Sequence, residues 1–172
     1  MKRLMLMLAL GTLSALGASG WHYRNHDYGF GLQLPSPGWK QVSYPQGVVA
    51  FRGHDGEVGV LVRNEDQARY QASVQNFHHV MTTLPNLLQK PRFEETHTRH
   101  GCTVSYAELI EMSPDRDQPV VVGVAHLRLP SGNTVVTTFQ STLSVQHNKL
   151  DLQEVSVREG EAHTICLSVD QE

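Results

Sequence analysis

The sequence predicts an α+β fold, an antiparallel β-sheet meander with one main amphipathic helix packed on one face. Three observations support this class: short alternating apolar runs, one long segment with helical periodicity, and short turn-rich loops between the later runs. About three strands precede the helix and about five follow it. Because no linker, repeat or low-complexity tract interrupts the pattern, we expect a single domain.

The first twenty residues have the three-part pattern of a secretory signal. Basic residues precede an uncharged apolar stretch that is too short to span a bilayer, and small residues follow it. We expect a signal peptide over residues 1–20, cut between Gly17 and Gly20, and one mature domain over 21–172. The protein is then periplasmic or secreted, without stable membrane insertion. A retained anchor or a buried N-terminal helix is the alternative.

The stretch after the leader predicts the first strand and the corner that ends it. Phe30, Leu32 and Leu34 alternate with smaller or polar residues, which is typical of a strand with one buried face. The tetrapeptide "PSPG" stops this strand, and the runs "GVVAFRG" and "EVGVLVRN" continue the meander. We expect Phe30 and Trp39 to lie in the core. A ligand platform formed by the clustered aromatic residues is the alternative.

The next segment predicts the only strong helix. Its apolar residues step by four and three positions, as one stripe of a helix does: Tyr70, Val74, Phe77, Met81, Leu84 and Leu88. We expect Asn64 to be the N-cap, with Gln67 as its capping-box partner, and Pro85 to end the helix near Thr83. If the stripe is core, Phe77→Ala should cost roughly 3–5 kcal/mol of stability.

The rest of the chain has the pattern of extended segments joined by short loops. The runs "TVSYAELIEM", "VVVGVAHLRL" and "TVVTTFQSTLSV" predict consecutive hairpin strands. The first two are joined by the loop "SPDRDQP", Ser113 to Pro119. The last segment, "EVSVREGEAHTICLSV", alternates in the same way and predicts a final hairpin.

Cys102 and Cys166 are the only cysteines of the chain. Both lie in runs predicted to be extended, in a protein predicted to reach an oxidising compartment, so we expect a disulfide between them. Closing so long a loop would stabilise the fold by about 4 kcal/mol in the chain-entropy model. Two buried, unpaired thiols are the alternative.

Residues that could carry chemistry form no recognised pattern. The sequence has neither a Gly-x-Ser-x-Gly elbow nor a glycine-rich phosphate loop, and Glu94 and Glu95 should point to opposite faces of a strand. The ten histidines have no zinc-site spacing, so we expect no catalytic residue, metal or cofactor. The formal charge of −3, which becomes −5 when Lys2 and Arg3 leave with the leader, gives no attraction to nucleic acid.

The segment "YGFGLQLPSPGWKQV" resembles the N-terminal signature of the PsbP/DcrB-like group. The matching residues are Tyr28, Gly29, Phe30, Leu32, Leu34, Pro35, Gly38 and Trp39. The resemblance extends through the predicted helix and implies an α/β/α sandwich around an antiparallel sheet, with no shared catalytic residues. Members of the group look like accessory proteins, among them periplasmic components and chaperones tied to type VI secretion effectors. Such folds close with a C-terminal helix, whereas this chain reads as strands there.

These observations favour an exported, non-enzymatic accessory protein that binds another protein. One specific form is a periplasmic immunity protein that blocks a basic secretion-system effector or toxin. The loop residues Asp115, Arg116 and Asp117 are then the expected contact with this partner, because loops held by rigid strands concentrate recognition residues. A periplasmic accessory protein that binds a small ligand or a metal is one alternative. An unrecognised hydrolase is another.

Overall fold

The computed structural model describes residues 12–15, 21–35, 38–43, 48–54, 56–113, 115, 117–147 and 149–171. The first strands are β1 (Thr12–Ala15), β2 (Trp21–Asn25), β3 (Phe30–Leu34), β4 (Lys40–Ser43), β5 (Val49–Arg52) and β6 (Glu57–Asn64). Helix α1 (Gln67–Thr83) is followed by the long strands β7 (Leu87–His97), β8 (Thr103–Ser113), β9 (Gln118–Arg128) and β10 (Asn133–Thr142). The chain then forms β11 (Val145–Gln146), β12 (Lys149–Leu150), helix α2 (Leu152–Leu167) and β13 (Asp170–Gln171).

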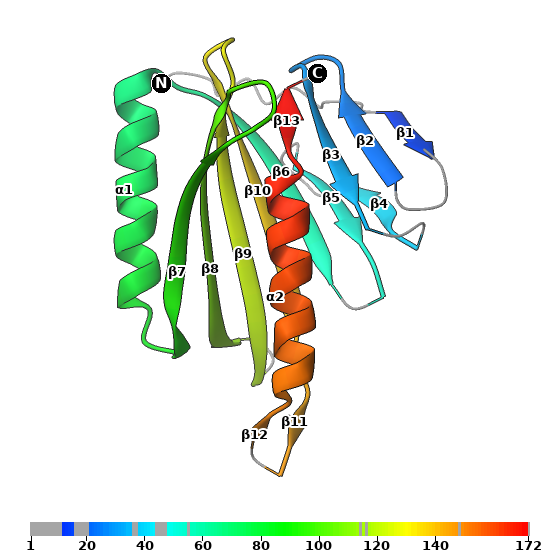
Figure 1. Ribbon diagram of the computed structural model, residues 1–172, viewed down its shortest axis with the longest axis vertical. Coiled ribbons are helices and arrows are strands. Elements are labelled where there is room, and N and C mark those ends of the chain that lie inside the picture. Colours follow the sequence, from blue (N-terminus) through cyan, green and yellow to red (C-terminus); the bar gives the residue numbers. More distant parts are fainter. Residues whose placement is uncertain are drawn as a thin grey trace.

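A seven-stranded antiparallel sheet of order β4-β5-β6-β10-β9-β8-β7 separates the two helices (Figure 1). Tyr106 and Ala107 are neighbours on β8 and therefore point to opposite faces of this sheet. Ala107 packs against Met81 of α1, whereas Tyr106 lies with Ala162 of α2 around Gly123. A smaller sheet of order β1-β2-β3-β13 lies on the α2 side. The α+β class is as predicted, and the two helices give the sandwich that the family resemblance implied.

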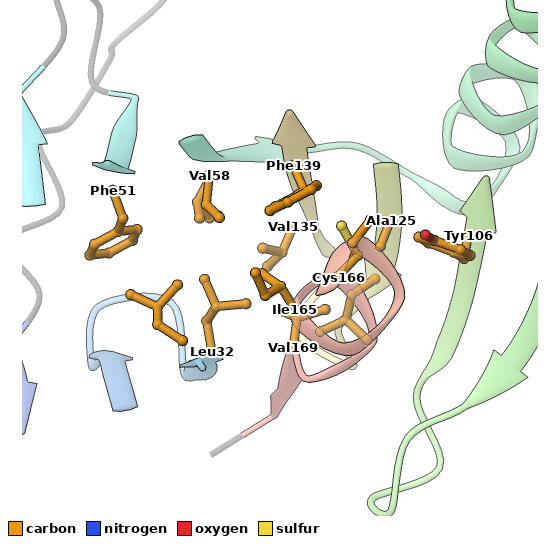
Figure 2. Packing of buried hydrophobic residues seen from close by; sticks show 14 of the residues in the cluster. Leu32, Phe51, Val58, Tyr106, Ala125, Val135, Phe139, Ile165, Cys166 and Val169 are labelled. Carbon is orange, nitrogen blue, oxygen red and sulfur yellow. The ribbon is translucent and has the colours of Figure 1, made fainter. Parts of the chain in front are cut away.

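The main core lies between α2, the small sheet and the α2-facing side of the large sheet. Figure 2 shows Leu32 of the small sheet, Phe51 and Phe139 of the large sheet and Ile165 of α2 converging in it. A Cβ atom at Gly123 would lie 3.0 Å from the Cβ of Ala162, so β9 and α2 approach closely because both residues are small. Phe30 is buried here, and Trp39 is buried as well, as predicted.

The core under α1 is much smaller. Its buried members are Met81 of α1 and Ala107 and Leu109 of β8, with Phe77 and Leu84 partly buried beside them. We call this group the α1 core. The predicted helical stripe is therefore only partly right, because just Tyr70 and Met81 in it are buried, Val74 and Phe77 are half-buried, and Leu88 lies exposed in β7.

Helix α1 begins two residues later than expected from its capping pattern. Asp66 is its N-cap, and one oxygen of the Asp66 carboxylate accepts a hydrogen bond of 2.8 Å from the backbone N–H of Arg69. Asn64 belongs to β6 instead, where it pairs with Asn133. The end of the helix is as predicted, because α1 stops at Thr83 before Pro85.

The predicted C-terminal hairpin is wrong, because this segment forms helix α2. Asp151 caps the helix by accepting hydrogen bonds from the backbone N–H groups of Gln153 and Glu154, 2.9 and 3.2 Å long. Buried residues on α2 include Val155, Ala162 and Ile165, spaced as one face of a helix requires. Their burial against the sheet stabilises the helix despite Gly160 and the β-branched residues, which favour extended structure.

The predicted disulfide is also absent, since Cys102 and Cys166 are both buried free thiols. Helix α2 places the sulfur of Cys166 against the carbonyl of Thr137 on β10. Thr137 lies opposite Ala125 of β9, and Ala125 in turn lies opposite Tyr106 of β8. Tyr106 is four residues from Cys102 along the extended chain, which corresponds to roughly 13 Å. A disulfide requires Cα atoms within about 7 Å, so the two sulfur atoms cannot bond in this fold.

Of the predicted leader, residues 1–20, the structure describes only residues 12–15. Strand β1 lies within residues 1–20 and pairs antiparallel with β2. The predicted cut sites at Gly17 and Gly20 lie outside the described residues. Within the part of the chain that is described, no helix is long and apolar enough to cross a membrane. The signal peptide and the mature domain therefore stay predictions.

Candidate functional site

The predicted contact loop lies at one end of the sandwich. Asp115 and Asp117 are both exposed in the connection between β8 and β9, while Arg116 lies outside the described residues. The backbone at Asp117 is left-handed, with φ 50°, and its N–H donates a 3.1 Å hydrogen bond to the carbonyl of Ser113. This short turn holds the loop against the ends of two long strands.

The hairpin β11–β12 and the start of α2 lie at the same end (Figure 1). Asp117 shares a hollow of about 440 Å³ with Val145 of the hairpin and with Glu154 and Arg158 of α2. Three apolar side chains of this region are unusually exposed: Leu152 at 78%, Val145 at 52% and Val157 at 52%. We call the group Asp115, Asp117, Val145, Leu152 and Val157 the end surface.

A second candidate is a cleft of about 640 Å³ between α2 and strands β7 and β8. Its buried centre is Glu108, which pairs with Arg92, and Arg92 also pairs with Glu159 of α2 at 3.1 Å. The hydroxyl of Tyr106 donates a 2.7 Å hydrogen bond to the other oxygen of Glu108. Burial raises the pKa of Tyr106, so its hydroxyl stays protonated and remains a donor.

This cleft links α2 to the edge of the sheet. His163 of α2 lies 3.1 Å from Glu94 of β7, and its ring stands edge-on to the ring of Tyr106, with centroids 5.4 Å apart. Neither Tyr106 nor Glu108 has a buried polar atom without a partner. The cluster therefore satisfies its own hydrogen bonds, and we interpret it as a structural network that anchors α2 to the edge of the sheet.

The largest hollow of the three is a groove of about 840 Å³ between α1 and the sheet, which we call the α1 groove. Figure 1 shows α1 close to β7 at the lower end of the helix and apart from it toward the upper turns. The helix lines the groove with two adjacent rows of side chains. One row is Tyr70, Val74 and His78, and the other is Gln67, Gln71 and Gln75. The remaining lining residues are Glu95, His100, Gly101, Cys102, Thr103, Arg128, Leu129, Pro130 and Gly132.

The charges of the α1 groove nearly cancel. Glu95 and Arg128 are its charged lining residues, and Arg128 donates hydrogen bonds to the carbonyls of Glu65 and Gly132. Burial lowers the pKa of His78, which favours its neutral form. Glu94 and Glu95 point to opposite faces, as predicted, since Glu94 lines the α2 cleft and Glu95 the α1 groove.

A buried histidine lies next to this groove, beneath α1. His126 of β9 is only 4% exposed, its ring centroid is 4.9 Å from that of Phe77, and its Nδ1 has no hydrogen-bond partner in the described structure. Burial is the main reason that the pKa of His126 is lowered to about 4, and the nearby positive charge of Arg63 lowers it further. His126 is therefore neutral at physiological pH and forms part of the packing under α1.

Sequence reasoning missed the buried ionisable residues Glu108 and His126, although a signal for each was present. Glu108 lies between Tyr106 and Ile110 among the alternate residues of β8 whose side chains face the main core. His126 has the same kind of position on β9, facing α1. A charged or titratable residue at an inward position of an alternating strand was the available signal. The described residues contain no group of three or more His, Cys, Asp or Glu side chains that could hold a metal ion.

Comparisons with known proteins inform the fold. No family model matches the sequence, and no curated protein matches it significantly. The solved structure of the Ran-binding protein Mog1p of Saccharomyces cerevisiae is similar, with a TM-score of 0.50 and 14% identity over 94% of this chain and 96% of that chain. LpqN of Mycobacterium tuberculosis, described as involved in cell envelope biogenesis, gives a TM-score of 0.46 and 14% identity over 93% and 89%.

At 14% identity, the likeness to Mog1p shows the fold and nothing more specific. It extends over nearly the whole of both chains, so it includes the C-terminal helix that the sequence patterns missed. The similarity supports the PsbP-like part of the sequence resemblance. The protein therefore has a Mog1/PsbP-like α+β fold.

Proposed function

We propose that the protein is an exported, non-enzymatic accessory protein that binds another protein through the end surface. The observation that carries this proposal is the exposure of Leu152 at 78%, at the end of the sandwich that also presents Val145 and the loop with Asp115 and Asp117. Exposed apolar groups surrounded by polar ones are typical of protein-binding surfaces. The loop and the hairpin that present these groups are anchored to the long strands and to α2.

The more specific form of the proposal is a periplasmic immunity protein for a basic effector. Two exposed carboxylates would steer a basic partner toward the end surface, and the apolar residues would contribute the buried contact. Mog1p is a Ran-binding protein, so a protein of this fold can serve as a protein-binding module. The link to DcrB-like proteins rests on the opening sequence motif.

A matched pair of variants tests the proposal. Leu152→Arg places a charge in the end surface, whereas Val80→Arg changes another exposed apolar side chain, 45% exposed, on α1. Both positions are exposed, so each change should alter stability by no more than about 0.5 kcal/mol. We expect affinity capture from periplasmic extract to lose the partner with Leu152→Arg and to retain it with Val80→Arg. Equal recovery of the same proteins by both variants would refute the end surface as the interface.

The acidic loop is tested separately with the double variant Asp115→Ala and Asp117→Ala. Both side chains are exposed, so stability should again stay within about 0.5 kcal/mol of the parent. We expect association with the captured partner to slow, most strongly at low salt, because the change removes steering charges. Association kinetics by surface plasmon resonance at two salt concentrations measure this. An unchanged rate at low salt would rule out electrostatic steering by this loop.

A further inference from the structure

We propose that the α1 groove binds a peptide segment in extended conformation, with Gln67, Gln71 and Gln75 hydrogen-bonded to the peptide backbone. The three glutamines form one row along α1 and line the groove over its length. This site lies between α1 and the turns β7–β8 and β9–β10, so it shares no residue with the end surface. The inference goes beyond the proposed function and does not depend on it.

The spacing of the glutamines matches the repeat of an extended chain. Residues four apart on a helix are separated by about 6.0 Å along its axis, and every second residue of a strand by about 6.6 Å. Over the three glutamines the difference grows to only about 1 Å, which flexible glutamine side chains can absorb. Each carboxamide has both donors and an acceptor, as a peptide unit requires.

The three carboxamides are available for such contacts. All three glutamines are exposed, and no hydrogen bond to any of their side chains is present among the described residues. The stretch of α1 from Gln67 to His78 is about 16 Å long, which corresponds to about five residues of extended peptide. A volume of about 840 Å³ is within the range of about 300–1,000 Å³ typical of ligand sites.

The other walls of the groove indicate which peptides would fit. Tyr70 and Val74 provide a partly apolar floor, and Leu129 and Pro130 line the groove from the β9–β10 turn. Alternate side chains of an extended peptide point to the same side, so every second residue would meet this floor. The charges of Glu95 and Arg128 nearly cancel. We therefore infer an uncharged segment with small or medium apolar residues at every second position.

A phage-displayed library of random eight-residue peptides is the probe. Peptides selected on the full-length protein are synthesised with a fluorophore, and binding is measured by fluorescence anisotropy. A neutral hydrogen bond contributes about 1 kcal/mol, so Gln71→Ala should weaken binding about fivefold, and the triple change Gln67→Ala, Gln71→Ala and Gln75→Ala roughly 100-fold. Alanine favours helix, so these variants should keep α1 folded, which circular dichroism checks.

Asn76→Ala is the matched control, because it removes an exposed carboxamide of the same helix that does not line the groove. We expect this variant to bind the peptide like the parent. Because the proposed peptide is uncharged, the affinity of the parent for it should change less than about twofold between 50 and 300 mM salt. A selected peptide with N-methylated alternate amides should lose binding, because it lacks backbone donors.

Selection without enrichment of any peptide would overturn the proposal, as would equal binding by the parent and the triple variant. Peptides that are insensitive to the triple variant but lost with Leu152→Arg would locate binding at the end surface instead. That outcome would reject the α1 groove and leave the proposed function standing. Loss of partner capture with Leu152→Arg would, in turn, say nothing against the groove.

Discussion

The two faces of the seven-stranded sheet are covered by helices in very different ways. On the α2 face, Ile165 and Cys166 are completely buried, and the small sheet extends the same core. On the α1 face, the buried core is reduced to Met81, Ala107 and Leu109, while α1 side chains such as Phe77 stay half-buried. The main core thus supplies most of the apolar burial, and the α1 face leaves room for a groove beside a weakly packed helix.

The different packing of α1 and α2 shows that the clarity of a helical pattern in the sequence does not indicate how much each helix contributes to stability. Helix α1 has the clearer amphipathic stripe, yet its contact with the sheet is thin. Helix α2 has a weak pattern, yet it packs so closely that Gly123 has no room for a side chain. We expect perturbations of the two faces to differ accordingly.

The largest effect should come from Ile165→Ala on the α2 face. Ile165 is fully buried in the main core, and truncation of such a residue typically costs 2–5 kcal/mol, so we expect a loss of about 4 kcal/mol. Urea unfolding followed by tryptophan fluorescence measures it. A loss below about 1 kcal/mol would contradict the assignment of α2 to the main core.

Acid should weaken the α1 face through His126. Its pKa is about 4 in the folded protein and close to 6.5 when unfolded, so the unfolded chain binds the proton first as pH falls. The free energy of unfolding therefore keeps its full contribution from neutral His126 above about pH 6.5. It falls by about 3 kcal/mol as the pH is lowered from about 6.5 to about 4. The groups around this ring are Arg63, Glu65 and His78, and the pKa of His78 is lowered too, which adds to the same trend.

His126→Leu tests this pH dependence, because leucine keeps an apolar contact for Phe77 and cannot take up a proton. We expect the variant to show a much smaller loss of stability between pH 6.5 and 4 in urea titrations. His79→Leu, at an exposed position of α1, is the control and should follow the parent. Identical pH profiles for the parent and His126→Leu would exclude His126 as the source.

Phe77→Ala should have a smaller effect than the sequence alone predicted. Because Phe77 is half-buried and its main ring contact is His126, we expect a loss of about 2 kcal/mol in place of 3–5. Urea unfolding beside Ile165→Ala gives the direct comparison of the two faces. A cost equal to or above that of Ile165→Ala would show that the α1 face is packed as firmly as the α2 face.

The two cysteines give the smallest-scale comparison, because their labelling measures exposure and not stability. Both thiols belong to the main core, but Cys102 is 5% exposed and also lines the α1 groove, whereas Cys166 is completely buried. Burial raises the pKa of both thiols, so both should react slowly with maleimide, and Cys102 should react at least about ten times faster. Mass spectrometry resolves the two sites. Absence of any thiol in the unfolded, unreduced protein would contradict the placement of the two cysteines as separate, free thiols.

Much of the fold could be predicted because the long strands alternate and α1 is amphipathic. Phe30, Leu32 and Leu34 are all buried, as their alternation indicated. Helix α2 was missed because Val155 and Val157 alternate around a serine and Gly160 follows, a local pattern that favours strands. Packing against β9 overrides that preference. The spacing of Val155, Ala162 and Ile165 was the helical signal, and the cap residue Asp151 was a second one.

The candidate site was predictable only where loop chemistry defined it. The turn residues around Asp115 and Asp117 marked an exposed loop, and both residues are exposed. The apolar part of the end surface could not be foreseen. Leu152 and Val145 would ordinarily be assigned to a core, and only the direction of α2 and of the β11–β12 hairpin leaves them at the surface.

The position of α2 and β13 after the strands that they cover has a consequence for biosynthesis. Residues 152–171 cover the main core through α2 and also add a strand to the small sheet, because β13 pairs with β3. During synthesis the strands that precede this segment emerge before the helix that shields them. The emergence of residues 152–171 therefore sets the earliest moment at which the main core can close. For a chain that must cross a membrane unfolded, this order of synthesis would postpone folding without the help of any partner.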